Sequence, residues 1–335
     1  MTITSEFKVA CRKVGLALGA VLLARLLTEA VSLLLVSLLR GTDPTISYIL
    51  VWGVSVILLY GGIIVSAAFI FGFKWNDNKL YYKKCKRLGK AVAWVLPSYG
   101  AGQLINFTVL AISFLLANNK QAVQDTYAPI ADGGAMSSFA TIIVIIIQMV
   151  VIAPVLEEFW ARGIIQSGLS KYGHGFSIMA SALLFGFAHG NVHQFCFTFV
   201  IGIVLGYVRY ASDSIIPTTI IHFILNSVAA VILLLSSSDP VISGIAKVQQ
   251  GIELNGLENT LLVVLGIIVV IIFIFIIAGV INAIIKLKNN RLYRPKNNYP
   301  EMTKTEKCIA LVKDPVFAIS AALSVAMMIV MIFIS

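Results

Sequence analysis

Residues 139–162 read FATIIVIIIQMVVIAPVLEEFWAR, a long apolar run that ends in Glu157-Glu158 and closes on Arg162. A run of this kind is typical of a helix that crosses a bilayer, whose hydrocarbon core of about 30 Å needs roughly 20 apolar residues. Two adjacent carboxylates at the end of such a run are costly to bury, so they need a partner, a proton or a function. We interpret them as functional.

The composition places the whole chain in the membrane. Of its 335 residues 59% are hydrophobic and 12% are charged, and the mean hydropathy is +0.94. These values exclude an ordinary soluble domain. The apolar runs are continuous rather than alternating, which favours helices over barrel strands. We therefore predict an all-α polytopic integral membrane protein, a bundle of about eight to nine transmembrane helices with an intramembrane polar site.

The predicted helices follow one another along the whole chain, and basic stretches separate some of them. They span about Val14–Leu39, Ile46–Phe73, Ala91–Ala117, Phe139–Leu169, Phe176–His189, His193–Tyr210, 214–235, Leu261–Ile285 and Pro315–Ile334. The chain divides into N-terminal transmembrane helices (1–137), a core (138–236) and C-terminal transmembrane helices with a basic cytoplasmic loop (237–335).

The net charge of +10 comes mainly from Lys and Arg between the apolar runs, at Lys74–Lys90 and Lys286–Lys313 among other places. This pattern sets the topology and does not indicate nucleic-acid binding. It predicts a multi-pass protein of the cell membrane with a cytoplasmic N-terminus. Inside the first helix, Arg25 and Glu29 are spaced i,i+4, and we expect them to neutralise each other.

The acidic motif itself divides into two parts. On an α-helix, Glu158 and Arg162 are i,i+4 neighbours and can pair. Glu157 is rotated by about 100° from Glu158 and should point elsewhere. The spacing thus predicts one supported carboxylate, Glu158, and one free carboxylate, Glu157.

Further polar residues interrupt the apolar segments that follow. His189 ends one predicted helix, and His222 and Asn226 lie one turn apart on another. Counted from the turns at about 1.5 Å per residue, Glu157 and His189 lie roughly 21 and 22 Å along antiparallel neighbours, and Asn226 lies roughly 20 Å along its own helix. These side chains should therefore converge at one depth in the membrane.

Such a group suits the hydrolysis of an amide. A carboxylate and an imidazole that share a water molecule form a general base. A second imidazole and an amide can donate to an oxyanion. Together they indicate water attacking a peptide carbonyl.

The chain here resembles the CAAX protease and bacteriocin-processing (CPBP, or Abi) family of intramembrane proteases, over about Phe139–Leu235. The three motifs in chain order are Glu157-Glu158-x-x-x-Arg162, Phe185-x-x-x-His189 and His222-x-x-x-Asn226. All three in this order are specific, whereas a double Glu followed by Arg would not be.

The resemblance implies that the core (138–236) is a CAAX-protease-like catalytic core, with a helical catalytic chamber within the membrane and endoproteolysis of a membrane-associated protein or peptide. It implies that Glu157 and His189 activate water and that His222 and Asn226 hold the oxyanion. Glu158 and Arg162 would support the site.

The family has been described both as metal-free and as metalloproteases, and two readings follow. We expect no cofactor, because the sequence has no His-Glu-x-x-His motif. The alternative is a catalytic zinc bound by Glu157, His189 and His222, which could leave a coordination position open for water.

Two other function classes remain beside an intramembrane endopeptidase. One is a non-catalytic bacteriocin-immunity or binding protein with the same fold, and the other is a proton-coupled carrier. The expected partners are membrane lipids and a membrane-associated protein or peptide substrate, and not nucleic acid.

Overall fold

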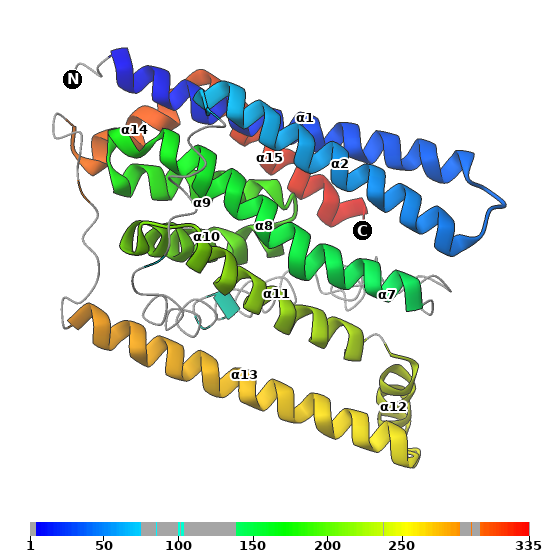
Figure 1. Ribbon diagram of the computed structural model, residues 1–335. Helices are drawn as coiled ribbons and strands as arrows, with labels where there is room; N and C mark the ends of the chain where they lie inside the picture. The colour runs from blue at the N-terminus through cyan, green and yellow to red at the C-terminus, as the bar shows by residue number, and fades with distance from the viewer. Residues whose placement is uncertain are drawn as a thin grey trace.

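The computed structural model describes residues 5–74, 139–236, 238–288 and 302–334, together with positions 85, 100, 102, 103 and 296. Regular structure in these residues is entirely helical, which confirms the predicted fold class (Figure 1). The elements are α1 (Ser5–Leu38), α2 (Pro44–Phe71), α7 (Phe139–Ile146), η3 (Ile147–Ile152), α8 (Ala153–Glu158), η4 (Phe159–Gln166), η5 (Ser170–Tyr172), α9 (His174–Ala188), α10 (Val192–Ser212), α11 (Ile216–Ser236), α12 (Asp239–Gln250), α13 (Gly256–Lys288), α14 (Lys304–Lys313) and α15 (Pro315–Ile334).

Among the described residues, 6 helices are long and apolar enough to cross a membrane, or up to 7 spans if the bent pair α14–α15 is one. The most apolar of them, Gly256–Gly279 of α13, has a mean hydropathy of 3.7, and none of that window is buried. These are the helices of a polytopic membrane protein. The predicted helix Ala91–Ala117 falls almost wholly outside the described residues, so the predicted total of about eight to nine stays a prediction.

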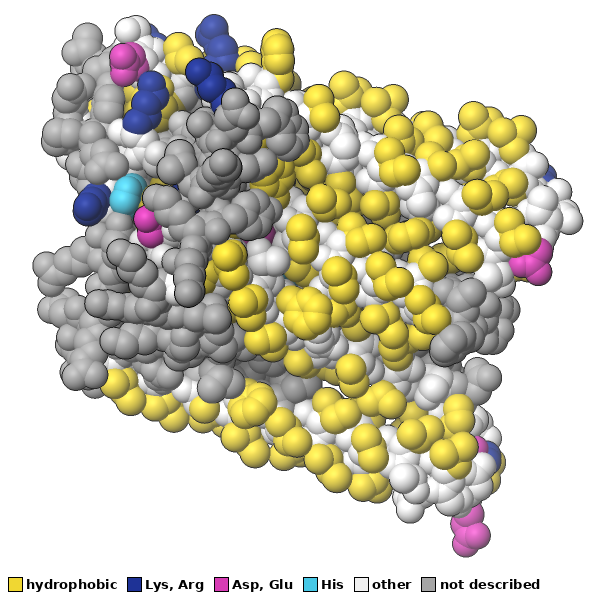
Figure 2. Space-filling model, viewed as in Figure 1, with side chains coloured by type: hydrophobic (Ala, Val, Ile, Leu, Met, Phe, Trp, Pro, Cys, Tyr) yellow, Lys and Arg dark blue, Asp and Glu magenta, His cyan; other side chains and the backbone are white. Residues whose placement is uncertain are grey.

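The surface agrees with a membrane environment. Figure 2 shows apolar side chains over most of the described surface on one face, while the charged side chains gather toward the ends of the molecule. A belt of this kind suits contact with lipid tails, because unpaired charges are costly in hydrocarbon.

Three local features differ from the prediction. α1 begins at Ser5 rather than Val14, because the charged residues ahead of the apolar run continue the helix. The stretch predicted as a basic loop up to Lys313 contains α14, whose start is fixed by a capping box between Thr303 and Glu306. The short helix α12 was not predicted.

α1 and α2 form an antiparallel hairpin (Figure 1). Asp43 caps α2 by accepting from the backbone N–H groups of Thr45 and Ile46 at 2.9 and 3.1 Å, and Pro44 occupies the first turn. Gly72 ends α2 with a φ of 67°. The hairpin is therefore encoded locally at both ends of its second helix.

The helix that begins at Phe139 is not the regular α-helix predicted for Phe139–Leu169. Two π-helical segments, η3 and η4, flank α8. The N–H of Ala153 donates five residues back, to the carbonyl of Gln148. The next donor in this register would be Pro154, which has no N–H, so the carbonyl of Met149 is left for another partner.

Close packing joins this helix to α9 and α10. A Cβ added to Gly202 would lie 3.0 Å from the Cα of Ala182, so only glycine lets these two helices approach so closely. Gln166 donates its side-chain N–H to the carbonyl of Gly206 at 2.7 Å. The first contact holds α10 against α9, and the second holds it against η4.

The core extends beyond the predicted central part of the chain. One buried cluster contains Phe7 of α1, Tyr60 of α2, Trp160 of η4, Phe185 of α9 and Met328 of α15. The N-terminal and C-terminal helices thus pack directly on the segment that carries the acidic motif.

Candidate active site

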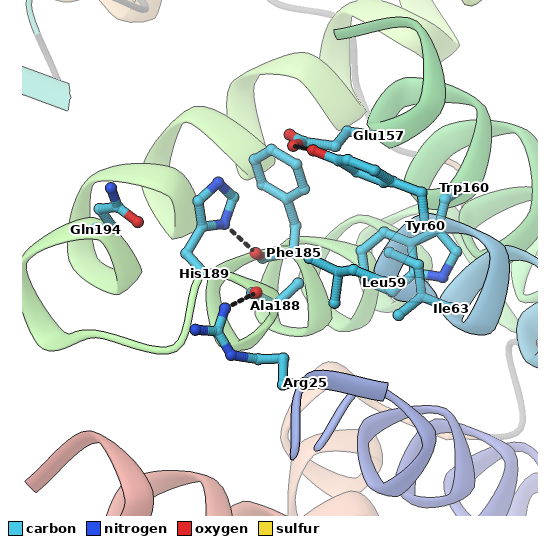
Figure 3. A pocket seen from close by; sticks show the side chains of 10 residues that line it. All are labelled: Arg25, Leu59, Tyr60, Ile63, Glu157, Trp160, Phe185, Ala188, His189 and Gln194. Atoms are coloured by element: carbon cyan, nitrogen blue, oxygen red, sulfur yellow. Dashed lines mark hydrogen bonds between the residues drawn. The ribbon is translucent and has the colours of Figure 1, made fainter. Parts of the chain in front are cut away.

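A cavity of about 140 Å³ lies beside the acidic motif, between the N-terminal hairpin and the segment from α8 to α10 (Figure 3). Two predicted site residues, Glu157 and His189, line it. The lining side chains are Arg25, Leu59, Tyr60, Ile63, Glu157, Trp160, Phe185, Ala188, His189 and Gln194.

The Glu158 side of the motif is completely enclosed. Glu158 and Arg162 have no exposed side-chain surface, and they pair at 3.3 Å between Oε2 and Nε. Arg162 also donates to the carbonyl of Gly202 at 3.2 Å and lies 4.8 Å from the ring centre of Phe185. The predicted i,i+4 pair is therefore present.

His222 joins the two carboxylates. Its Nδ1 lies 3.2 Å from Oε1 of Glu158, and its Nε2 lies 3.7 Å from Oε2 of Glu157. An ionised carboxylate can only accept, so Nδ1 donates to Glu158 and leaves Nε2 directed at Glu157. The imidazole is only 6% exposed. Its orientation is set by a buried carboxylate, as in other acid–base sites that orient a histidine in this way.

Glu157 is not the free carboxylate that the sequence predicted. The hydroxyl of Tyr60 in α2 donates to its Oε1 at 2.7 Å, and Oε2 faces His222. The error arose because Glu157 was placed by rotation on its own helix alone. Glu157 keeps 14% of its side chain exposed, in contrast to Glu158.

His189 presents one nitrogen to the cavity. Its Nδ1 bonds the backbone carbonyl of Phe185 at 2.8 Å (Figure 3). A carbonyl can only accept, so Nδ1 carries the proton, and in the neutral ring Nε2 carries a lone pair. That nitrogen can accept a proton from water.

Asn226 is engaged in a structural bond. Its Nδ2 donates to the carbonyl of Met149 at 2.8 Å, which is the carbonyl left free by Pro154. An amide nitrogen has two N–H groups, so a second donor remains. Asn226 lies one turn beyond His222 on α11, and neither side chain lines the cavity.

Sequence reasoning missed Tyr60 altogether and assigned Arg25 only its ion pair. The Arg25–Glu29 pair is present at 3.7 Å, but Arg25 also donates to the carbonyl of Ala188 at 2.8 Å. A tyrosine hydroxyl within an apolar helix, as at Tyr60, is the one signal that could have been noticed, because buried tyrosines usually find a hydrogen-bond partner.

A metal fits the described residues poorly. No group of three His, Cys, Asp or Glu side chains in the described part of the chain could hold a metal ion, the set Glu157, His189 and His222 included. A catalytic zinc needs three protein ligands around an open position. We therefore derive no step of the reaction through a metal.

One comparison with known proteins finds a family for the segment that carries this site. Residues 139–228 match the family model described as type II CAAX prenyl endopeptidase Rce1-like. The matched segment resembles the Rce1-like family. It runs from α7 into α11 and contains all six predicted site residues, and the match is consistent with the CPBP resemblance. No curated protein and no solved structure matches the chain. At the level of the family, the match supports an intramembrane protease.

Proposed function

We propose that this protein is an intramembrane endopeptidase that hydrolyses a peptide bond in a membrane-associated protein or peptide. The observation that carries the proposal is the shared cavity of Glu157 and His189. Within the segment that matches a protease family, it joins a partly exposed carboxylate and an imidazole with a lone pair.

In the proposed reaction, a water molecule in the cavity donates a proton to Glu157, with His189 aligning it through Nε2. The water oxygen forms a bond to the peptide carbonyl carbon. The C–N bond then breaks as the captured proton is passed to the leaving amine. Glu158 and Arg162 keep His222 oriented toward Glu157 throughout.

The oxyanion of the tetrahedral intermediate would be held by Asn226 and by His222, which donates through Nε2–H as an imidazolium because its Nδ1–H is bonded to Glu158. The second N–H of Asn226 supports this role, as does the position of His222, whose Nε2 lies 3.7 Å from Oε2 of Glu157 one turn away from Asn226 on α11.

The size of the cavity bears on the form of the substrate. About 140 Å³ accommodates a peptide unit and a water molecule, but not a helix, which is roughly 10 Å across. The part of the substrate that enters this cavity is therefore an extended segment.

We also propose a location in the cell membrane with a cytoplasmic N-terminus. In Figure 1 the N-terminus, the end of α2 and α14 lie toward the same end of the molecule. Lys8, Arg12, Lys13, Lys74, Lys304 and Lys313 belong to these segments. Positive charge gathered at one end favours the cytoplasmic side.

The test is cleavage of a panel of membrane-associated peptides by the purified protein in detergent. Glu157→Gln should lower kcat by about 10²–10⁴-fold, because it removes the base with little change in shape. The matched control is Glu253→Gln, at an exposed carboxylate after α12, which should cleave like the wild type.

Each arm is repeated with a strong zinc chelator. Cleavage that survives chelation supports the metal-free mechanism, whereas loss on chelation with rescue by zinc favours the metalloprotease alternative. Cleavage by Glu157→Gln at the wild-type rate would overturn the proposal. Absence of cleavage in every arm would favour the immunity or binding reading, and proton flux across liposomes would favour the carrier.

A further inference from the structure

The N-terminal hairpin contributes part of the cavity, although it lies outside the matched residues 139–228. Arg25 comes from α1, and Leu59, Tyr60 and Ile63 come from α2. Two of these four side chains are polar. Tyr60 bonds the carboxylate of Glu157 itself, and Arg25 bonds the backbone carbonyl of the residue just before His189. Glu157 and His189 are the two residues proposed to activate water.

Tyr60 acts on the carboxylate of Glu157. An ionised carboxylate only accepts, so the phenol donates its single proton to Oε1. The oxygen–oxygen distance of 2.7 Å is that of a charge-assisted bond. With Oε1 held by α2, Oε2 is the oxygen that remains for His222 and for water.

The position of Tyr60 is itself well determined. Tyr60, Ile63 and Ala67 are buried, at the i, i+3 and i+7 positions of one face of α2. That face packs against α1 and η4. The hydroxyl is therefore presented by a rigid helix rather than by a mobile loop, as a positioning group requires.

Arg25 acts on the turn that carries His189. The last carbonyls of a helix have no partner within the helix. In α9 the carbonyls of Gly186 and Phe187 accept from the backbone N–H groups of His189 and Gly190, at 3.1 Å each. The carbonyl of Phe185 accepts from the His189 ring, and that of Ala188 accepts from Arg25 at 2.8 Å.

Arg25 thus completes the end of α9, and its positive charge suits the negative end of the helix dipole. Gly190 makes room for it. This residue has a φ of +70°, and a Cβ added there would collide with the Arg25 guanidinium. The turn that sets the direction of the His189 ring is therefore built around an α1 side chain.

We propose that α1 and α2 are a working part of the active site, in which Tyr60 positions Glu157 and Arg25 positions His189. This inference rests on the proposed peptidase function and adds two positioning residues to it. Both come from helices that the family match does not cover.

The test compares Tyr60→Phe with Tyr48→Phe, a matched change three turns earlier on α2 and not in the cavity lining. Tyr60→Phe should lower kcat about 10- to 100-fold, as expected for the loss of a hydrogen bond to a charged group. KM should stay within about twofold of the wild-type value, and the melting temperature should not change. Tyr48→Phe should leave kcat, KM and melting unchanged. A merely structural role of Tyr60 would lower melting or raise KM without this selective loss of kcat.

Arg25 is tested by Arg25→Met and by the conservative Arg25→Lys. Methionine removes the donor to Ala188 and should lower kcat about 10-fold or more, whereas lysine retains one donor and should recover part of the loss. If Arg25→Met alters only melting, or lysine recovers nothing, its positioning role is wrong.

Glu157→Gln in the same assay keeps the two proposals apart. Loss of cleavage in Glu157→Gln together with a wild-type kcat in Tyr60→Phe overturns the role of Tyr60 alone. Full cleavage in Glu157→Gln overturns the proposed function and this inference with it.

Discussion

The two ends of the polar network differ in their surroundings, although Glu157 and Glu158 are adjacent in the chain. Glu158 and Arg162 have no exposed side-chain surface, and α10 closes over them through Gly202. Glu157 is 14% exposed and faces a cavity that the N-terminal hairpin helps to line. The comparison suggests that one carboxylate holds the structure together while its neighbour is kept accessible for chemistry.

The sharpest test of this contrast is the same substitution at both carboxylates. Glu158→Gln should reduce the free energy of unfolding by about 3–5 kcal/mol, because it leaves the Arg162 charge buried without its partner. Glu157→Gln should change it by about 1 kcal/mol or less, because that side chain reaches the cavity. Thermal and denaturant unfolding in detergent measures both. Equal losses of stability would break the comparison.

Asn226 combines a structural and a chemical role, since it bonds the Met149 carbonyl and is also proposed as an oxyanion donor. Asn226→Ala should reduce the free energy of unfolding by about 1–3 kcal/mol, because the Met149 carbonyl loses its partner. It should also lower kcat by about 10²-fold or more.

A second substitution separates these effects. Pro154→Ala restores a backbone N–H in the register that serves Met149, so the double variant Pro154→Ala/Asn226→Ala should regain stability but not kcat. Recovery of both would make the role of Asn226 structural only.

The smallest expected effects test the packing at the enclosed end. Gly202→Ala should cost about 1–3 kcal/mol of unfolding free energy, because its Cβ would press on Ala182 at 3.0 Å. At Gly53 of α2 an added Cβ meets nothing within 4 Å, so Gly53→Ala should stabilise the protein by about 0.5–1 kcal/mol. A Gly202→Ala variant that melts at or above the wild-type temperature would show that α9 and α10 are less tightly packed than their backbones indicate.

Much of the fold could be predicted, because it depends on local properties of the chain. Apolar runs of membrane-spanning length predicted most of the described helices, but not the short helices α12 and α14. The Glu158–Arg162 and Arg25–Glu29 pairs followed from i,i+4 spacing, and both are present. The likeness to a protease family, predicted over about Phe139–Leu235 from the order of three short motifs, is confirmed by the family match over residues 139–228.

The contacts between helices could not be predicted. Tyr60 meets Glu157 across 97 positions of sequence, and His222 meets Glu158 across 64. Such contacts depend on how far each helix is rotated about its axis. In a soluble protein an apolar stripe along the helix reveals this rotation, because the stripe faces the core. In a membrane helix both the lipid-facing and the buried faces are apolar, so this signal is largely lost.

The sequence by itself determined that the chain is a helical membrane protein, which segments are strongly apolar and which polar residues interrupt them, because hydropathy and i,i+4 spacing act within one helix. Only the tertiary structure decided that Glu157 is held by Tyr60, that His222 lies between two carboxylates and that Asn226 bonds Met149. The reason is geometric. Two π-helical segments and Pro154 alter the register of the central helix, and its partners come from helices whose rotation local pattern does not encode.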